Sequence, residues 1–369
     1  MGGSIFYAQL SDRVKALGGY HNAHLHLDRS HTLGAAETGT DIASAHSTLS
    51  HKHSLISGIH QGPLYATDNL TARLNQSIDE MVRCNTRRAD SVIDVSADGL
   101  GLRALETALS VAKTRAHEID FRAAVYSPLG FRDDESERWD LIEEGAKIAG
   151  FVGCLPERDD TDDYPDHIGY ETSCSRMIDL AMRHSLDLQV HTDQANHPNE
   201  RGTERLLDVI EGDGITYGTP EAPKIWVVHM ISPTVYPDAR WANLLERLKR
   251  ANIGVICCPS AAIGMRQLRG VMTPTTNSIA RVLELCAAGI QVRLGSDNLA
   301  DMLSPSTTAN MSDEVFMLSA ALRFYDVEIL AKLACGQPLS SDDILTIQSH
   351  LEANDVEMAK AMRRWGPVS

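Results

Sequence analysis

The stretch Asn22-Ala23-His24-Leu25-His26-Leu27-Asp28 organises this chain. Its two histidines are two residues apart, and residues i and i+2 of a β-strand point to the same face. Both imidazoles can therefore reach one metal ion, while the apolar residues between and beside them suit the opposite face. The pair alone is weak evidence, because 15 histidines in 369 residues produce some such pairs by chance. Its weight comes from the residues at the ends of later strands.

Short, apolar, β-branched segments alternate with amphipathic segments along the chain. We expect eight strands, at residues 19–28, 90–96, 119–127, 149–155, 186–191, 224–229, 253–258 and 290–295. We expect helices at residues 5–17, 68–87, 101–117, 133–148, 170–185, 199–211, 237–251, 276–288, 313–334, 342–347 and 353–364. Strands that are apolar on both faces and alternate with helices are typical of a covered parallel sheet, and eight such units predict a (β/α)₈ barrel. A doubly wound open sheet is the structural alternative.

No linker or repeat calls for a second domain. We expect one barrel domain, with residues 1–18 as an N-terminal extension, 19–300 as the barrel and 301–369 as C-terminal helices. We predict that residues 29–66 form an elaborated loop over a site, because they are polar, lack periodicity and are rich in histidine. The histidines are His31, His46, His51, His53 and His60.

The bulk composition limits the partners. The formal charge is −16, from 50 acidic and 34 basic residues, which argues against nucleic acid or an anionic membrane as a partner. Seven cysteines without a CxxC motif indicate reduced thiols in a cytoplasmic protein. No basic-then-apolar leader and no apolar run of about 18 residues is present, so we expect neither secretion nor a membrane span.

Histidine and aspartate residues end four of the predicted strands. His24 and His26 end the first strand, His191 the fifth and His229 the sixth, and Asp297 follows the eighth. The carboxyl ends of barrel strands share one rim, which is where barrel enzymes carry their chemistry. Imidazole and carboxylate ligands with a position left for water suit a catalytic zinc or ferrous ion. Such an ion makes hydroxide available near neutral pH, and Asp297 is placed to take the proton of that water.

This constellation resembles the amidohydrolase superfamily of metal-dependent barrels. The resemblance extends over about residues 19–335 and is closest to the cytosine deaminase branch, which includes the N-isopropylammelide hydrolases. The segments that carry it are His24-Leu25-His26-Leu27-Asp28-Arg29-Ser30, Val255-Ile256-Cys257-Cys258-Pro259-Ser260 and Leu294-Gly295-Ser296-Asp297-Asn298-Leu299-Ala300-Asp301.

The resemblance implies roles for individual residues. His24, His26, His191 and Asp297 would bind one metal ion, Zn²⁺ in the first place and Fe²⁺ in the second. His229 would hydrogen-bond the attacking water or the tetrahedral intermediate. A single ion is favoured because the fourth strand ends without a lysine that could bridge two metals. Substrate-binding roles fall to Gln194, His229, Asn298 and Asp301, and Tyr126, Phe131 and Met302 flank the rim, where they could stack on a flat ring or simply pack.

The sequence departs from the deaminase pattern at three places. Gln194 stands where these deaminases carry a proton-shuttling glutamate, and a carboxamide cannot carry a proton through a cycle. Asp193 could take over proton transfer; alternatively it faces away and caps the next helix. The substrate-binding glutamine that often follows the third strand is missing. The small β-sandwich usual in the family is expected to be absent, because few residues precede the first strand and the tail is helical and polar.

The implied activity is hydrolysis of a C–N bond in a small nitrogen heterocycle. Loss of exocyclic ammonia or amine, as in a deaminase, is favoured by the segments quoted above. Opening of a cyclic amide, as in imidazolonepropionases, is the alternative that Gln194 supports. A barrel that keeps a metal without catalysis is a third reading. Homo-oligomeric assembly is compatible with the sequence, which shows no identifiable interface.

Overall fold

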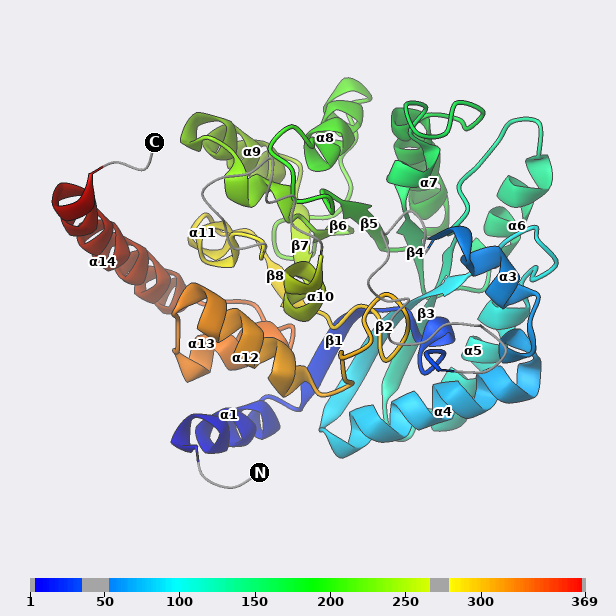
Figure 1. Cartoon of the computed structure of the whole chain (residues 1–369), viewed down its shortest axis with the longest axis horizontal. Helices are drawn as coiled ribbons and strands as arrows, with labels where there is room; N and C mark the ends of the chain where they lie inside the picture. The colour runs from blue at the N-terminus through cyan, green and yellow to red at the C-terminus, as the bar shows by residue number, and fades with distance from the viewer. Residues whose placement is uncertain (1–3, 35–52, 266–278, 367–369) are drawn as a thin grey trace.

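The computed structural model describes residues 4–34, 53–265 and 279–366. Its centre is one sheet of eight parallel strands in which each strand pairs with the next in chain order (Figure 1). Each strand overlaps a segment predicted from the sequence. The strands are β1 (Tyr20–Leu25), β2 (Thr86–Asp94), β3 (Asp120–Tyr126), β4 (Phe151–Cys154), β5 (Leu188–Thr192), β6 (Ile225–His229), β7 (Ile253–Cys257) and β8 (Val292–Leu294).

The first and last strands meet and close the sheet. The backbone N–H of Asp297 donates to the carbonyl of His24 over 3.0 Å. One residue away, the side-chain amide of Asn22 donates to Ser296 Oγ (2.7 Å) and accepts from the backbone N–H of Ser296 (3.0 Å). Sequential strand order with contact between β1 and β8 confirms the (β/α)₈ barrel and excludes the doubly wound sheet, whose strand order reverses at its centre.

Helices surround the barrel (Figure 1). They are α1 (Ile5–Ala16), α3 (Ile56–His60), α4 (Thr67–Arg83), α5 (Arg103–Arg115), α6 (Ser136–Ala146), α7 (Tyr170–His184), α8 (Gly202–Gly212), α9 (Asp238–Arg250), α10 (Pro259–Gly264), α11 (Val282–Ala287), α12 (Met311–Leu322), α13 (Val327–Ala334) and α14 (Ser341–Trp365). Short 3₁₀ turns are η1 (Leu27–Arg29), η4 (Pro63–Tyr65), η5 (Pro156–Asp159) and η6 (Ser232–Val235). Every strand within the described ranges belongs to the barrel sheet.

The C-terminal helices differ from the prediction in two ways. The single helix expected over 313–334 is two helices, because Arg323 takes a left-handed conformation (φ 52°) and Asp326 caps a new helix by accepting from the N–H of Ile329. The two helices expected over 342–364 are one, α14. It begins with a reciprocal capping box between Ser340 and Asp343 and contains no glycine or proline that would end it earlier.

Alternation along the strands separates two apolar layers. On β6, Ile225 and Val227 join the large core that includes the helices, whereas Trp226 and Val228 pack in a small cluster with Ile256. The same alternation operates on β5. Leu188 and Val190 belong to the large core, so Gln189 and His191 project to the opposite side, toward the barrel axis. The strand period therefore decides which residues can line a central site.

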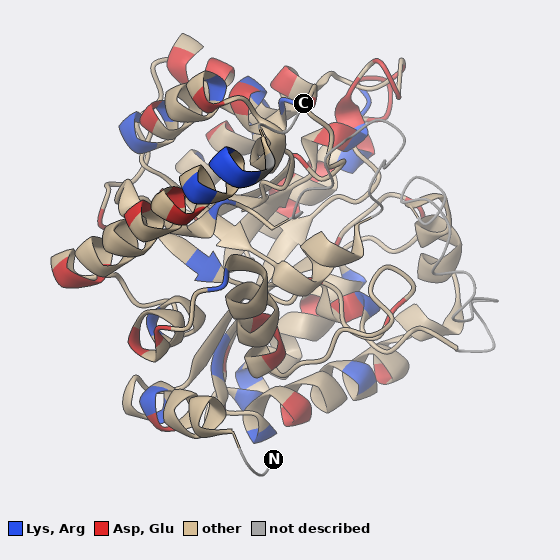
Figure 2. Cartoon of the chain, turned by 60° about the vertical axis from the view of Figure 1, so that its left-hand side comes forward, with Lys and Arg blue, Asp and Glu red and all other residues tan. Residues whose placement is uncertain are grey.

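The outer helices carry mixed charges. Figure 2 shows Lys and Arg interleaved with Asp and Glu along them. Some of these residues link neighbouring helices: Arg247 of α9 lies 2.7 Å from Asp208 and 2.9 Å from Glu211, both on α8. Among the described helices, none combines the length and the apolar composition needed to cross a bilayer.

Candidate metal centre

Three imidazoles and a carboxylate converge at the carboxyl end of the barrel. His191 Nε2 lies 3.1 Å from His24 Nε2 and 3.4 Å from His26 Nε2. Asp297 Oδ1 lies 3.3 Å from His26 Nε2 and 3.6 Å from His24 Nε2. All four side chains are buried. The structure thus brings together, from three strand ends, the four residues predicted as metal ligands.

His229 borders this cluster. Its Nε2 lies 4.0 Å from Asp297 Oδ2, and its ring centroid is 5.4 Å from that of His191. The ring of Tyr126, at the end of β3, stands beside the cluster with centroids 5.5 Å from His26 and 5.4 Å from His191. An aromatic ring and a histidine therefore stand beside the candidate metal centre.

Local backbone features aim these side chains. A Cβ at Gly295 would lie 2.9 Å from both the backbone nitrogen and the Cβ of His24, so a glycine is required for β8 to approach β1 this closely. His229 (φ 77°) and Asp297 (φ 62°) both have the left-handed backbone that non-glycine residues rarely adopt. Strain of this kind persists where the surrounding structure enforces it, and it concentrates at functional sites.

The chemistry of the donor set fits a bound cation. His24 Nδ1 donates to Gln189 Oε1 (2.7 Å) and His191 Nδ1 donates to the carbonyl of Cys154 (3.0 Å), which fixes both tautomers. In a neutral ring the Nε2 atom then carries a lone pair, and these lone pairs face one another at 3.1 Å. Asp297 Oδ1 is buried beside them without a hydrogen-bond partner. A cation among these atoms would satisfy all of them.

The electrostatics keep the imidazoles available as ligands. Burial lowers the pKa of His24 and His191, and it lowers the pKa of His26 and His229 to about 4. These four rings are therefore neutral at pH 7, which is the form that binds metal.

Asp193 lies next to this centre in the chain but faces away from it. Its carboxylate accepts from the backbone N–H of Gly202 (2.6 Å) and of Thr203 (3.0 Å), and from the Thr203 hydroxyl. These contacts cap the N-terminus of α8, which was the alternative considered from the sequence. Both oxygens of Asp193 are thus occupied, and its part in proton transfer stays a prediction.

Gln194, Asn298 and Asp301 have protein partners at the rim. The Gln194 amide donates to Glu157 Oε2 over 3.0 Å. The Asn298 amide donates to Asp301 Oδ2 (2.6 Å), and Asp301 Oδ1 accepts from the backbone of the loop that follows β8. Asp301 thus shapes this loop, and its carboxylate is occupied. Substrate binding by Gln194, Asn298 and Asp301 stays a prediction.

Two supporting elements were not predicted from the sequence. Gln189 orients His24, and its position two residues before His191 on a buried strand was a usable signal. Arg29, just after the His-x-His pair, donates to both oxygens of Asp94 at the end of β2 (2.9 and 2.7 Å). Burial and these contacts make Arg29–Asp94 a fixed ion pair beside the metal centre, one that no short-range pattern indicates.

The histidine-rich segment contributes to this region. His60 Nε2 lies 3.0 Å from Asp94 Oδ2, and its Nδ1 lies 2.8 Å from Asp98 Oδ2. Burial, then the charges of Arg29, Arg158 and His26, lower the pKa of His53 to about 3. His31 lies 3.8 Å from Glu80. His46 and His51 lie outside the described residues.

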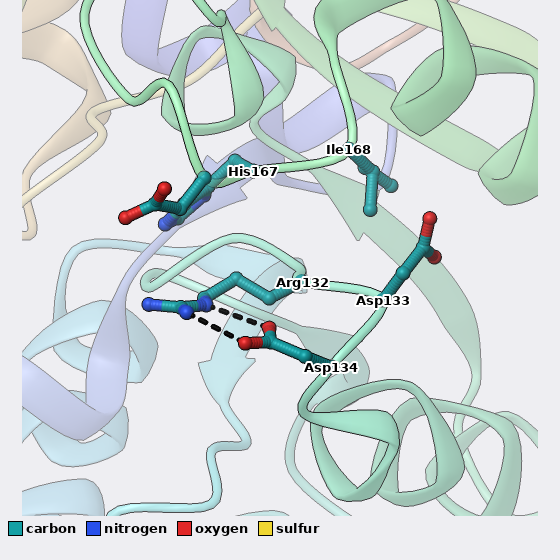
Figure 3. Close-up of a pocket in the computed structure, with 6 residues that line it drawn as sticks. Arg132, Asp133, Asp134, His167 and Ile168 are labelled. Carbon is teal, nitrogen blue, oxygen red and sulfur yellow. Dashed lines mark hydrogen bonds and ion pairs between the residues drawn. The ribbon is translucent and has the colours of Figure 1, made fainter.

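A separate surface pocket opens between the loops that follow β3 and β4. It encloses about 270 Å³ and is lined by Arg132, Asp133, Asp134, Asp166, His167 and Ile168 (Figure 3). Within it, Arg132 pairs with Asp134 at 2.8 Å. No residue of the metal centre lines this pocket, and we assign it no role.

Comparison of sequences finds distant relatives. No protein-family model matches the chain. An uncharacterised protein of Haemophilus influenzae is 26% identical over 283 residues, which are 76% of this chain and 95% of that protein. A pterin deaminase of Rhizobium rhizogenes is 21% identical over 184 residues, which are 50% of this chain and 39% of that enzyme.

Comparison of structures finds the same barrel in several enzymes. A 5-methylcytosine deaminase of Klebsiella pneumoniae with bound 5-fluorocytosine superposes with a TM-score of 0.71 at 22% identity, covering 87% of this chain and 77% of that one. An N-isopropylammelide isopropylaminohydrolase of Burkholderia multivorans superposes with a TM-score of 0.63 at 16% identity, covering 90% and 82%. A zinc-bound adenosine deaminase of Xanthomonas campestris gives 0.55 at 14% identity, covering 86% and 67%.

Proposed function

Because this chain has the barrel fold of the amidohydrolase superfamily, as the resemblance in its sequence predicted, we propose that it is a metal-dependent hydrolase. It acts on a C–N bond other than a peptide bond, in a small nitrogen heterocycle, and the favoured reaction is hydrolytic deamination. The observation that carries this proposal is the convergence of the Nε2 atoms of His24, His26 and His191. The unpartnered Oδ1 of Asp297 lies 3.6 Å from the first of these atoms and 3.3 Å from the second. The solved enzymes with this barrel include deaminases of 5-methylcytosine and adenosine.

His24, His26, His191 and Asp297 would hold one divalent ion, with Zn²⁺ favoured over Fe²⁺. An ion held there would lower the pKa of a bound water molecule and so supply the attacking hydroxide. Asp297, whose Oδ2 faces His229, accepts the proton of that water. His229 donates a hydrogen bond to the oxygen that becomes negatively charged as the new C–O bond forms.

Ring opening of a cyclic amide is the second candidate. The same four residues and His229 would serve it, because both reactions add water to a carbon bonded to nitrogen. The observation that favours it is Gln194, which stands where the resembled deaminases carry a proton-shuttling glutamate. In ring opening the leaving nitrogen stays attached to the product, and no ammonia is released.

We also propose the compartment and the partners of the enzyme. All seven cysteines are unpaired, and six of them are buried. Reduced thiols of this kind fit the cytoplasm, where disulfides are rare. The partner that we propose is the small heterocyclic substrate, and a homo-oligomer is compatible with it.

The test uses purified protein loaded with zinc or with iron. It is offered pyrimidines, triazines, imidazolones, pterins and hydantoins, while ammonia release and ultraviolet spectra are recorded together. Ammonia with the ring chromophore retained supports deamination, and loss of the chromophore without ammonia supports ring opening. The matched control is His191→Ala, which removes one ligand and should abolish both signals and stoichiometric metal. Metal binding without turnover of any substrate would favour the non-catalytic barrel.

A further inference from the structure

A buried carboxyl group lies against Gln194 at the rim of the barrel. Glu157 follows β4 in the η5 turn, and its Oε2 accepts from the Gln194 side-chain amide over 3.0 Å. Its second oxygen, Oε1, is buried and has no hydrogen-bond partner. A buried carboxyl oxygen without a partner is costly, so a group that the protein does not itself supply is expected to meet it.

The neighbouring carboxyl groups are occupied, which sets Glu157 apart. Asp193 accepts three hydrogen bonds from the start of α8. Glu200 accepts from the backbone N–H of Ala195 and from the Ser232 hydroxyl. Burial, then the charges of Glu200 and Asp193, raise the pKa of Glu157 well above its usual value. The Tyr170 hydroxyl on α7 is likewise buried without a hydrogen-bond partner, and its pKa is raised by burial and, to a lesser extent, by the charge of Glu157.

Glu157 belongs to the chain segment that follows β4, the strand next to the one that carries His191. β4 pairs with β5, and the carbonyl of Cys154, the last residue of β4, accepts from His191 Nδ1. Glu157 comes three residues after Cys154, and Gln194 three residues after His191. The Glu157–Gln194 hydrogen bond therefore ties together the two chain segments that leave the rim beside His191.

We propose that Glu157, oriented by Gln194, is the residue that exchanges protons with the ring nitrogen of the heterocyclic substrate. This inference rests on the proposed deaminase function. It supplies the carboxyl group that the chain lacks at position 194, where an amide cannot carry a proton. Gln194 is then a positioning residue, whose amide holds one oxygen of Glu157 and leaves the other to reach the substrate.

Glu157 and Asp297 together can carry out all the proton transfers of the reaction. Water oxygen bonds to the ring carbon, one water proton goes to Asp297, and protonated Glu157 gives its proton to the adjacent ring nitrogen. The bond between that carbon and the exocyclic nitrogen then breaks. Asp297 returns its proton to the departing amine, and the new hydroxyl gives its proton to Glu157. The products are ammonia and the ring carbonyl, and both carboxyl groups regain their starting states.

The test exchanges the two side chains in the metal-loaded protein. Glu157→Gln should lower kcat about 100-fold or more, within the range that general acid–base groups contribute, with metal content and KM little changed. The double variant E157Q/Q194E places the carboxyl on the other partner and keeps the amide–carboxyl hydrogen bond, and it should recover at least tenfold over E157Q. The alkaline limb of the kcat/KM profile that Glu157 sets should disappear in E157Q and return, at a shifted pH, in the exchange variant.

The control is Glu200→Gln, a buried carboxyl in the same cluster whose oxygens already have partners. It should keep kcat at pH 7 within about threefold and retain the alkaline limb. An E157Q variant within threefold of wild type overturns the proposal, and so does an exchange variant no better than E157Q. If E157Q does not fold, Glu157→Asp, which retracts the carboxyl, should lower kcat at least tenfold; an unchanged kcat overturns the proposal. A wild type that turns over no substrate overturns the proposed function as well, whereas an active wild type with an active E157Q overturns this inference alone.

Discussion

The buried histidine His60 provides a sharp test of the electrostatics around the site. Both of its ring nitrogens face carboxylates, Nδ1 at 2.8 Å from Asp98 and Nε2 at 3.0 Å from Asp94. Burial by itself lowers the pKa of His60, but the hydrogen bonds and negative charges of these two groups outweigh it and raise the pKa to about 9. The folded protein therefore holds this proton more tightly than the unfolded chain does.

The size of the effect follows from the two pKa values. A rise from 6.5 to about 9 corresponds to roughly 3 kcal/mol of folding free energy, at about 1.4 kcal/mol for each tenfold change in proton affinity. Because the pKa is raised on folding, this stabilisation is fully present below about pH 6.5. It is lost progressively as the pH rises through about 9.

The assay is urea denaturation of wild type and His60→Gln, with metal content held equal, at several values between about pH 6 and pH 10. Other titrating groups are common to both proteins and cancel in the difference. We expect wild type to exceed the variant most at the acidic end, and the difference in the free energy of unfolding to shrink by roughly 3 kcal/mol toward the alkaline end. A difference that stays constant across this range would refute the reasoning, because His60 would then not titrate between the two carboxylates.

Three further variants test single contacts. Gln189→Leu removes the acceptor that orients His24, and it should weaken metal binding about 10- to 100-fold in a chelator competition titration; an unchanged affinity would show that Gln189 does not orient this ligand. Asp193→Ala removes the cap of α8 and leaves buried donors unpaired, so the free energy of unfolding in urea should fall by about 2 kcal/mol; no loss would contradict the capping role. Gly130→Ala places a Cβ 2.7 Å from the carbonyl of Arg158 at a position with φ 68°, and thermal unfolding should show a loss of about 2 kcal/mol or more; wild-type stability would mean that the two loops can separate freely.

Most of the barrel could be predicted from the local pattern of apolar and β-branched residues. Each predicted strand overlaps an observed one, because strands covered on both faces need apolar, β-branched side chains whatever their neighbours are. The proposed metal ligands were equally predictable. His24 and His26 share a strand face, and the carboxyl ends of parallel strands must share a rim, so three distant segments could be placed together from the sequence.

Helix limits in the C-terminal part were less predictable. The division of 313–334 depends on one left-handed residue, Arg323, and arginine carries no propensity for that conformation. The continuity of α14 depends on the absence of any strong stop signal over 25 residues, which composition shows only weakly. Both features depend on small differences in backbone free energy. Contacts with neighbouring helices can reverse such differences.

By itself, the sequence determined the parallel barrel, the four side chains proposed as metal ligands and the rim on which they stand, because strand periodicity and parallel order decide all three. Only the tertiary structure decided where side chains beyond the strand ends point. Asp193 turns to α8 because its left-handed backbone (φ 57°) redirects the chain, and Glu157 meets Gln194 because β4 and β5 are neighbours although the residues are 37 positions apart. No periodic pattern extends past the end of a strand, so contacts between distant segments settle these orientations.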